Sequence, residues 1–310
     1  MLSFKAWIDG LRQVARAPLL ILLTVIVTVA VAAPFALVLG GELRAALADQ
    51  PPIALGSSEI DADWWNEFRS HAGGLAATFT PTVIGFAAPL DNLSAIADGT
   101  RRPAVLIVPI AAGVLAWALL WGIVLHRFDR RGGLSISEAA SAAFTHFPRF
   151  VVISAAAAAA QLLLYLTIHP LLFGAVYRTV ASDVTPESGA FAYRLLFYAI
   201  FGIPVVAISL TAEYARVAQV VTQESGIAAS IGTALRFIRR HWRTAAALYL
   251  FNTATFAIVM TGHGVIDSMG GTRVAGWRGV LIGQAFIVAR LAMRLVSGAS
   301  SLELFKKLRG

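Results

Sequence analysis

Six long apolar segments constrain the fold of this chain more than any other feature of its sequence. An α-helix of about 20 apolar residues crosses the roughly 30 Å hydrocarbon core of a bilayer. Only 14% of the 310 residues are charged, against about a quarter in soluble domains. The segments fall at about 17–39, 104–126, 150–172, 194–217, 244–263 and 278–299. The pattern predicts an all-α polytopic membrane protein, with six transmembrane helices in a single integral membrane domain over 1–310. Because the first segment is longer than the core of a secretory signal, we expect an uncleaved span there.

Basic residues cluster beside the ends of these segments. They gather at 126–131, at Arg149, in the run from Arg236 to Arg243 and in the tail at 306–309. Lysine and arginine on short connections mark the cytoplasmic side, so the clusters predict a cytoplasmic N-terminus and C-terminus. The same distribution accounts for the net charge of +8 without a nucleic-acid partner. The absence of cysteine excludes disulfides and cysteine-based metal or nucleophilic sites.

A basic amphipathic stretch precedes an apolar segment three times, at 11–18, 143–150 and 235–243, and a second apolar segment follows each time. This repetition predicts three units, each an interfacial helix that leads into a membrane hairpin. Such helices lie in the headgroup plane, and their basic residues favour anionic lipids. The predicted headgroup contacts are Arg12, Arg16, Arg236, Arg239, Arg240 and Arg243. At the start of the second unit, Ser135 and Glu138 have the spacing of a capping box.

The connection between the first two segments is long and acidic. Residues 41–100 carry a net charge of −6. We expect 41–102 to form an extracytoplasmic cap or a re-entrant insertion, because so long a connection is seldom a bare linker. A helix is expected within 61–79, carrying Trp64, Trp65 and Phe68, and adjacent tryptophans are typical of a membrane interface.

Charged residues inside spans are expensive in hydrocarbon and usually face the protein interior. Glu213 and Arg216 end the fourth segment, and Arg290 and Arg294 lie one helical turn apart in the sixth. We predict an intramembrane charge pair between Glu213 and one of the two arginines of the sixth segment. A functional interpretation is a gate or ion relay, whereas a structural one is a pair that locks the bundle. The position of all four charges in the predicted cytoplasmic half favours the structural interpretation.

Two further features of the spans bear on function. Pro204 lies near the middle of the fourth segment, where it predicts a helix kink, and transporters build midplane sites from such discontinuities. The neutral polar residues within spans are expected to set helix register through hydrogen bonds: Gln161, Thr167, His169, Asn252, Thr253 and Gln284.

The sequence contains none of the common catalytic motifs. It has no nucleophile elbow, no phosphate-binding loop, no zinc-protease helix and no paired carboxylates on one helix face. We therefore expect no enzymatic activity, no cofactor and no metal site.

The order of the elements, with Glu-Tyr-Ala-Arg at 213–216 and ALRFIRRHW at 234–242, resembles uncharacterised six-span bacterial inner-membrane proteins. It is also similar to the membrane domains attached to some glycerophosphodiester phosphodiesterases. The resemblance implies a six-helix fold with interfacial helices in a bacterial inner membrane and no assigned activity. The hydrolase activity is not carried over, because the hydrolase domain is missing here.

Two functions remain open at this point. The first is a structural or accessory subunit that binds anionic lipids and a membrane-protein partner or a second copy of the chain. The alternative is a small transporter or lipid-handling carrier with a site in the helix bundle.

Overall fold

The chain folds almost entirely into helices. The computed structural model describes residues 1–48, 62–80, 87–130, 132–182, 184, 186–223, 226–269 and 277–309. It is 91% helical, with no strand in the described ranges, and six of its helices are long and apolar enough to cross a membrane. Those candidate spans are Pro18–Ala46, Ala104–Arg130, Ile136–Ala181, Glu187–Val221, Ile227–Ser268 and Trp277–Arg309. The predicted fold class is confirmed: this is an all-α polytopic membrane protein.

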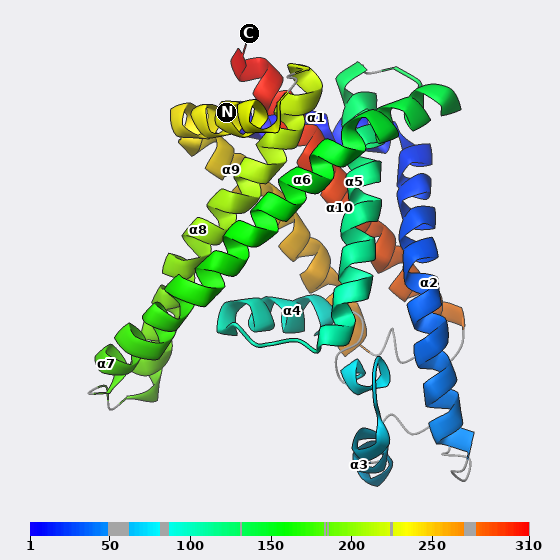
Figure 1. The fold of residues 1–310 in the computed structure, drawn as a ribbon, viewed down its shortest axis with the longest axis vertical. Coiled ribbons are helices and arrows are strands. Elements are labelled where there is room, and N and C mark those ends of the chain that lie inside the picture. The colour runs from blue at the N-terminus through cyan, green and yellow to red at the C-terminus, as the bar shows by residue number, and fades with distance from the viewer. Residues whose placement is uncertain are drawn as a thin grey trace.

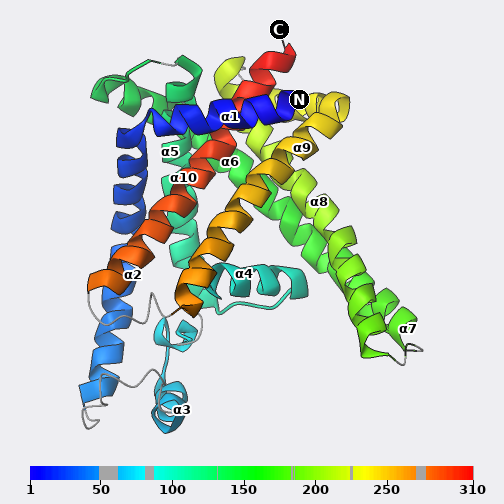
Figure 2. The ribbon, with the colours of Figure 1, turned by 180° about the vertical axis from the view of Figure 1, so that it is seen from behind.

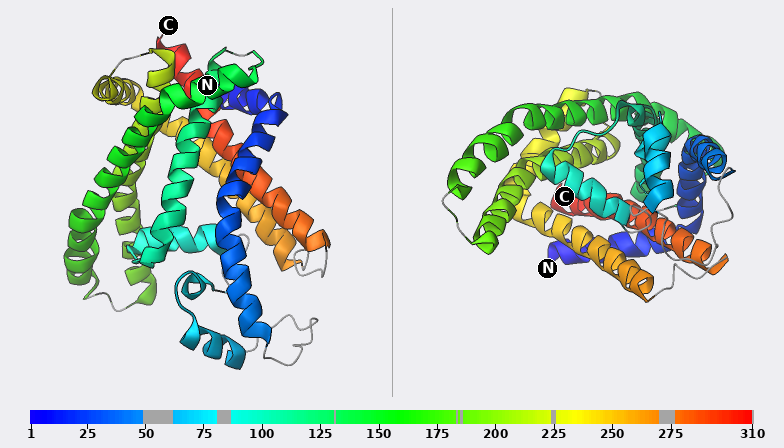
Figure 3. Two further views of the ribbon diagram at one scale, coloured as in Figure 1. Left: turned by 45° about the vertical axis from the view of Figure 1, so that its right-hand side comes forward. Right: turned by 90° about the horizontal axis from the view of Figure 1, so that it is seen from below.

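Both termini lie at one end of the bundle, which we call the terminal face, and the opposite end is the distal face (Figure 1). The long helices converge at the terminal face and spread apart toward the distal face, where the hairpin of α6 and α8 points away from α2 (Figure 3). The long helices are α1 (Leu2–Ala15), α2 (Pro18–Ala48), α5 (Ile107–Arg130), α6 (Ile136–His169), α8 (Glu187–Val221), α9 (Ile227–Ser268) and α10 (Trp277–Arg309). The short ones are α3 (Ala62–His71), η1 (Ala76–Thr78), α4 (Ala87–Asp98), η2 (Ala104–Leu106), η3 (Pro170–Val176) and α7 (Tyr177–Ala181).

The hydrophobic core lies near the terminal face, where the helices cross. Phe128 of α5, Phe150 of α6, Tyr214 of α8 and Phe305 of α10 are all fully buried there. Small residues at these crossings let the backbones of neighbouring helices approach one another closely. A Cβ added at Gly298 of α10 would lie only 2.2 Å from the ring of Trp121 in α5. The convergence of the bundle therefore depends on residues without side chains at the crossing points, as is common between membrane helices.

Helix α1 lies across the bundle axis and packs mainly on α10 (Figure 2). Its buried face consists of small residues, Ser3, Ala6, Gly10 and Val14. The large apolar side chain of Phe4, by contrast, remains 49% exposed. Helix α1 thus contacts the protein through its small residues and leaves a large apolar side chain on its surface.

The other two predicted interfacial segments begin α6 and α9. Ser135 and Glu138 form the predicted capping box at the start of α6. In α9 the backbone leaves helical geometry at His241 (φ −123°, ψ 30°). The part of α9 before His241 lies across the bundle and the part after it descends toward the distal face (Figure 1). Each of the three units therefore begins with a helical segment at the terminal face.

The described parts of the predicted cap are helical. Helix α2 continues to Ala48 instead of ending near residue 39. The helix expected within 61–79 ends at His71, and Trp64 and Phe68 pack with Ala76 of η1 in a small separate core. Helix α4 lies across the bundle near the distal face (Figure 1). Three of the acidic residues expected in the cap, Asp49, Glu59 and Asp61, fall outside the described residues.

Candidate functional site

The predicted charge cluster lies where α8 and α10 cross, but its pairing differs from the prediction. The carboxylate of Glu213 accepts hydrogen bonds from Ser297 Oγ (3.0 Å) and Ser301 Oγ (2.8 Å) of α10. Within the described ranges it forms no ion pair with Arg290 or Arg294, so the predicted direct pair is wrong. The reason is the height along α10: Ser297 and Ser301 continue the helix face that carries the two arginines, and it is the serines that lie level with Glu213.

Arg216 lies on the other side of this carboxylate. Its guanidinium donates to Ser154 Oγ of α6 (3.2 Å), and its Nε is buried with no hydrogen-bond partner. Glu213 attracts both Arg216 and Arg294 through space. A cavity of about 10 Å³ beside Glu213 and Arg216 has about the volume that one water molecule requires.

Arg294 and Arg290 contact aromatic rings. The guanidinium carbon of Arg294 lies 3.6 Å from the ring centroid of Trp117 in α5. That of Arg290 lies 5.6 Å from the ring centroid of Phe286. Such cation–π contacts occupy the flat face of a guanidinium and leave the N–H groups at its edge available. Among the residues that the structure describes, neither arginine donates a hydrogen bond.

Both arginines line a cavity of about 520 Å³ between α2, α9 and α10. The wall combines hydroxyl and amide groups with large apolar side chains. Its residues are Thr28, Tyr249, Asn252, Thr253, Phe256, Ile287, Arg290, Leu291, Met293, Arg294 and Ser297. We call this space the arginine cavity. It has the size of a typical ligand pocket.

The arginine cavity lies well along α10 from the terminal face. Helix α1 packs against Ser300, where a Cβ on Gly10 would come within 2.9 Å. Arg290 lies about 15 Å further along the axis of α10, at 1.5 Å per residue. With a hydrocarbon core of roughly 30 Å, an interfacial α1 places Arg290 well inside the membrane.

The six predicted headgroup arginines are all exposed. Arg12 and Arg16 line a groove of about 430 Å³ at the terminal face, together with Arg127 of α5 and Lys307 of α10. Asp9 is the ion-pair partner of both Arg12 (3.9 Å) and Lys307 (2.5 Å).

The other four headgroup arginines follow one another along the start of α9. Arg236 donates to Thr233 Oγ1 (2.8 Å), and Arg243 lies beside the ring of Trp242. Arg239 and Arg240 are exposed between them. A continuous basic edge therefore runs along this segment of the terminal face.

Pro204 does not interrupt its helix. Helix α8 is continuous from Glu187 to Val221, and the residue with non-helical dihedral angles is His241 of α9. Two of the predicted polar residues form bonds between helices, Gln161 with Ser209 (3.3 Å) and Asn252 with Ser300 (3.1 Å). Both hydrogen bonds support the predicted role of these polar residues in fixing the register between neighbouring helices.

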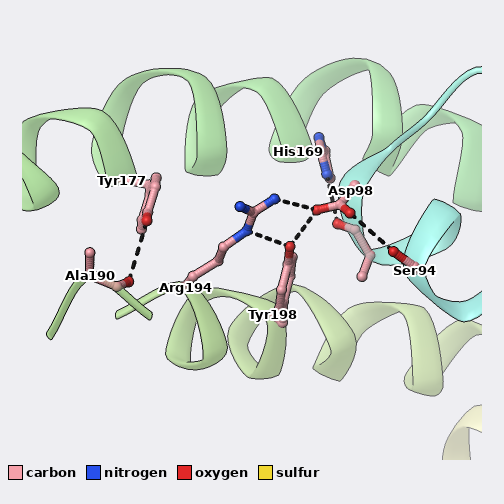
Figure 4. A network of polar contacts seen from close by, with 8 residues as sticks. Ser94, Asp98, His169, Tyr177, Ala190, Arg194 and Tyr198 are labelled. Atoms are coloured by element: carbon pink, nitrogen blue, oxygen red, sulfur yellow. Dashed lines mark hydrogen bonds and ion pairs between the residues drawn. The ribbon is translucent and has the colours of Figure 1, made fainter. Parts of the chain in front are cut away.

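Sequence reasoning missed a polar network near the distal face, which we call the distal latch (Figure 4). Asp98, at the end of α4, pairs with Arg194 of α8 (2.7 Å) and accepts a hydrogen bond from Tyr198. These two hydrogen bonds hold the pKa of the Asp98 carboxyl below its usual value. His169 of α6 contacts the Ala97 carbonyl (3.1 Å). Gly99, which follows Asp98, has φ +64° and leaves no room for a Cβ beside the His169 ring.

Comparisons with protein-family models, with curated proteins and with solved structures find no match to this chain. The described residues also contain no group of three histidine or acidic side chains that could hold a metal ion. The assignment of the chain as an integral membrane protein with six spans therefore rests on the length and apolar composition of its helices.

Proposed function

We propose that this protein is a non-enzymatic structural or accessory subunit, held at its terminal face by anionic lipid headgroups. The observation that carries the proposal is the pairing of exposed arginines with exposed apolar side chains on the same segments. Trp242 is 59% exposed beside the arginines of α9, and Phe4 is 49% exposed on α1, which carries the exposed Arg12. A helix in the headgroup plane buries its apolar side chains in the acyl region and keeps its arginines among the phosphates.

The proposal includes an orientation and a location. We infer that the terminal face is cytoplasmic, because both termini and the basic clusters lie there. The location we infer is a bacterial inner membrane, in keeping with the resemblance to six-span bacterial membrane proteins. An anionic cytoplasmic leaflet attracts each lysine or arginine near its surface by about 1 kcal/mol.

Partners of the same membrane are part of the proposal. Large apolar side chains remain exposed along the distal half of the bundle, among them Ile203 of α8 and Ile258 of α9. In a membrane these surfaces meet lipid, a partner protein or a second copy of the chain. No nucleic-acid partner is proposed.

Matched sets of arginine substitutions test the headgroup contacts. The first set replaces Arg236, Arg239, Arg240 and Arg243 with Gln. The control set makes the same change at Arg44, Arg69, Arg101 and Arg278, which are exposed outside the terminal face. The retention of phosphatidylglycerol through detergent purification, measured by mass spectrometry, should fall in the first set and stay at the wild-type level in the control. Equal retention in both sets would contradict the proposal.

A carrier of small molecules or lipids is the second candidate, favoured by one observation: the arginine cavity inside the bundle. Proteoliposomes that contain the protein test it through the movement of labelled lipid between leaflets. If the lipid moves no faster than in protein-free vesicles, the carrier function is excluded and the accessory function is the remaining candidate.

A further inference from the structure

The arginine cavity contains positive charge that the protein does not neutralise. Arg216 and Arg294 interact electrostatically with Glu213 where α8 and α10 cross, and Arg290 lies one helical turn from Arg294 on α10, so three cations accompany one carboxylate. The single carboxylate is already hydrogen-bonded to two serines. Two positive charges therefore remain in excess, at a depth where unpaired charge is costly.

The excess charge is directed into the cavity. Arg216 is bonded to Ser154 and lies outside the lining of the arginine cavity, whereas Arg290 and Arg294 belong to that lining. Both have ring contacts on one face and no hydrogen-bond acceptor among the described residues. Arg294 is exposed to the cavity space. The N–H groups of two guanidiniums are thus free to bind a ligand that enters there.

The spacing and chemistry of these donors select the ligand class. Residues i and i+4 project from the same face of a helix, so both guanidiniums can reach one anion. Guanidinium binds phosphate through two parallel hydrogen bonds, and a phosphate group offers several oxygens. The hydroxyls of Thr253 and Tyr249 line the same space as further donors.

The rest of the wall is apolar and includes Phe256, Ile287 and Leu291. A cavity with a cationic side and an apolar side suits an amphiphile whose anionic group meets the arginines. We propose that Arg290 and Arg294 form a binding site for a phosphate group inside the membrane, supplied by a phospholipid or by a free phosphate anion. This site is separate from the headgroup contacts at the terminal face.

Thermal unfolding of the full chain in a neutral detergent tests the site. The probes are a short-chain phosphatidylglycerol, inorganic phosphate and a short-chain diacylglycerol that lacks phosphate. In the wild-type protein the midpoint should rise with at least one of the two phosphate-bearing probes and not with diacylglycerol. A response to phosphatidylglycerol alone identifies a lipid as the source, and a response to inorganic phosphate identifies a soluble anion.

The double variant Arg290→Gln with Arg294→Gln should bind the active probe about 100-fold more weakly, because charge-assisted hydrogen bonds to both guanidiniums are lost. The matched control is Arg278→Gln, which removes a charge from the same helix outside the cavity. The four-arginine variant of α9 should keep its response, which separates this site from the headgroup contacts. No response in the wild type, or equal affinity in the double variant and the control, would overturn the proposal.

A second measurement leaves both Arg290 and Arg294 in place. Because the chain has no cysteine, Thr253→Cys introduces a single thiol into the cavity wall. The active probe should slow alkylation of this thiol and should not affect Ala254→Cys, an exposed position on the opposite side of the same helix, outside the cavity. Equal alkylation of Thr253→Cys with and without the probe would contradict the site even if the double variant failed to fold.

Discussion

At the scale of single residues, the tightest packing lies at Gly298. A Cβ there would come within 2.2 Å of the ring of Trp121, and forcing extra atoms into a packed site costs typically about 1–3 kcal/mol. We therefore expect Gly298→Ala to lower the midpoint of thermal unfolding in detergent. The control is Gly283→Ala in the same helix, where a Cβ meets nothing within 4 Å. Equal midpoints for the two variants would show that α5 and α10 do not approach so closely.

The two serines that hold Glu213 allow a second prediction. Replacing Ser297 and Ser301 together with Ala removes both donors from a carboxylate inside the bundle, and hydrogen bonds to charged groups contribute about 1.5–3 kcal/mol each. The double variant should be less stable than the wild type. Adding Glu213→Gln should then restore part of the loss, because the unsatisfied charge disappears. A triple variant less stable than the double variant would mean that the arginines, and not the serines, stabilise this carboxylate.

Residue positions also show where sequence reasoning succeeds and where it stops. The capping box at Ser135 could be predicted, because its partners are three residues apart. The partners of Glu213 could not, because helical periodicity places the arginines and the serines on one face of α10 and does not show which of them lies level with Glu213. The pair of Asp98 with Arg194 could not be predicted from the sequence either, because two residues so far apart in the chain leave no local pattern.

At the scale of elements, the distal latch couples α4 to the hairpin of α6 and α8. Hydrogen bonds from Tyr198 and Arg194 lower the pKa of Asp98 below its ordinary 3.8. A carboxyl with a lowered pKa stabilises docking fully above its ordinary pKa and loses that effect as the pH falls through the lowered value. We therefore expect α4 to stay docked at neutral pH and to loosen only below about pH 3.8.

Substitution should loosen α4 without acid. In Asp98→Asn, amide hydrogen exchange in 87–98 should be faster than in the wild type at pH 7. The control Asp91→Asn breaks the pair of Asp91 with Arg102. This pair does not involve α8, so the control should speed exchange less. If the amides of 87–98 exchange at the same rate in both variants, the distal latch does not hold α4 in place.

Element boundaries explain another difference between prediction and structure. Hydropathy ends the first span near residue 39, because charged residues follow at Glu42 and Arg44. Helix α2 nevertheless continues to Ala48, since its last residues are largely alanine and leucine, which favour helix. Hydropathy thus locates where a helix leaves the hydrocarbon, and helix propensity decides where it ends.

At the scale of the whole molecule, the basic clusters of the terminal face predict how the chain is oriented in its membrane. Single cysteines placed on opposite faces of this cysteine-free chain should differ in their reaction with a membrane-impermeant thiol reagent added to intact cells. Thr100→Cys, beside the distal latch, should react, and Gly232→Cys, at the start of α9, should react only after the membrane is permeabilised. The reverse pattern would place the terminal face outside the cell.

The central claim is that anionic lipid belongs to the functional form of this protein. Native mass spectrometry of the protein, released from its own membrane in mild detergent, tests that claim most directly. The account predicts a chain that retains phosphate-bearing anionic lipids, alone or together with a partner or a second copy. A solitary chain free of lipid, under conditions that keep it folded, would contradict it.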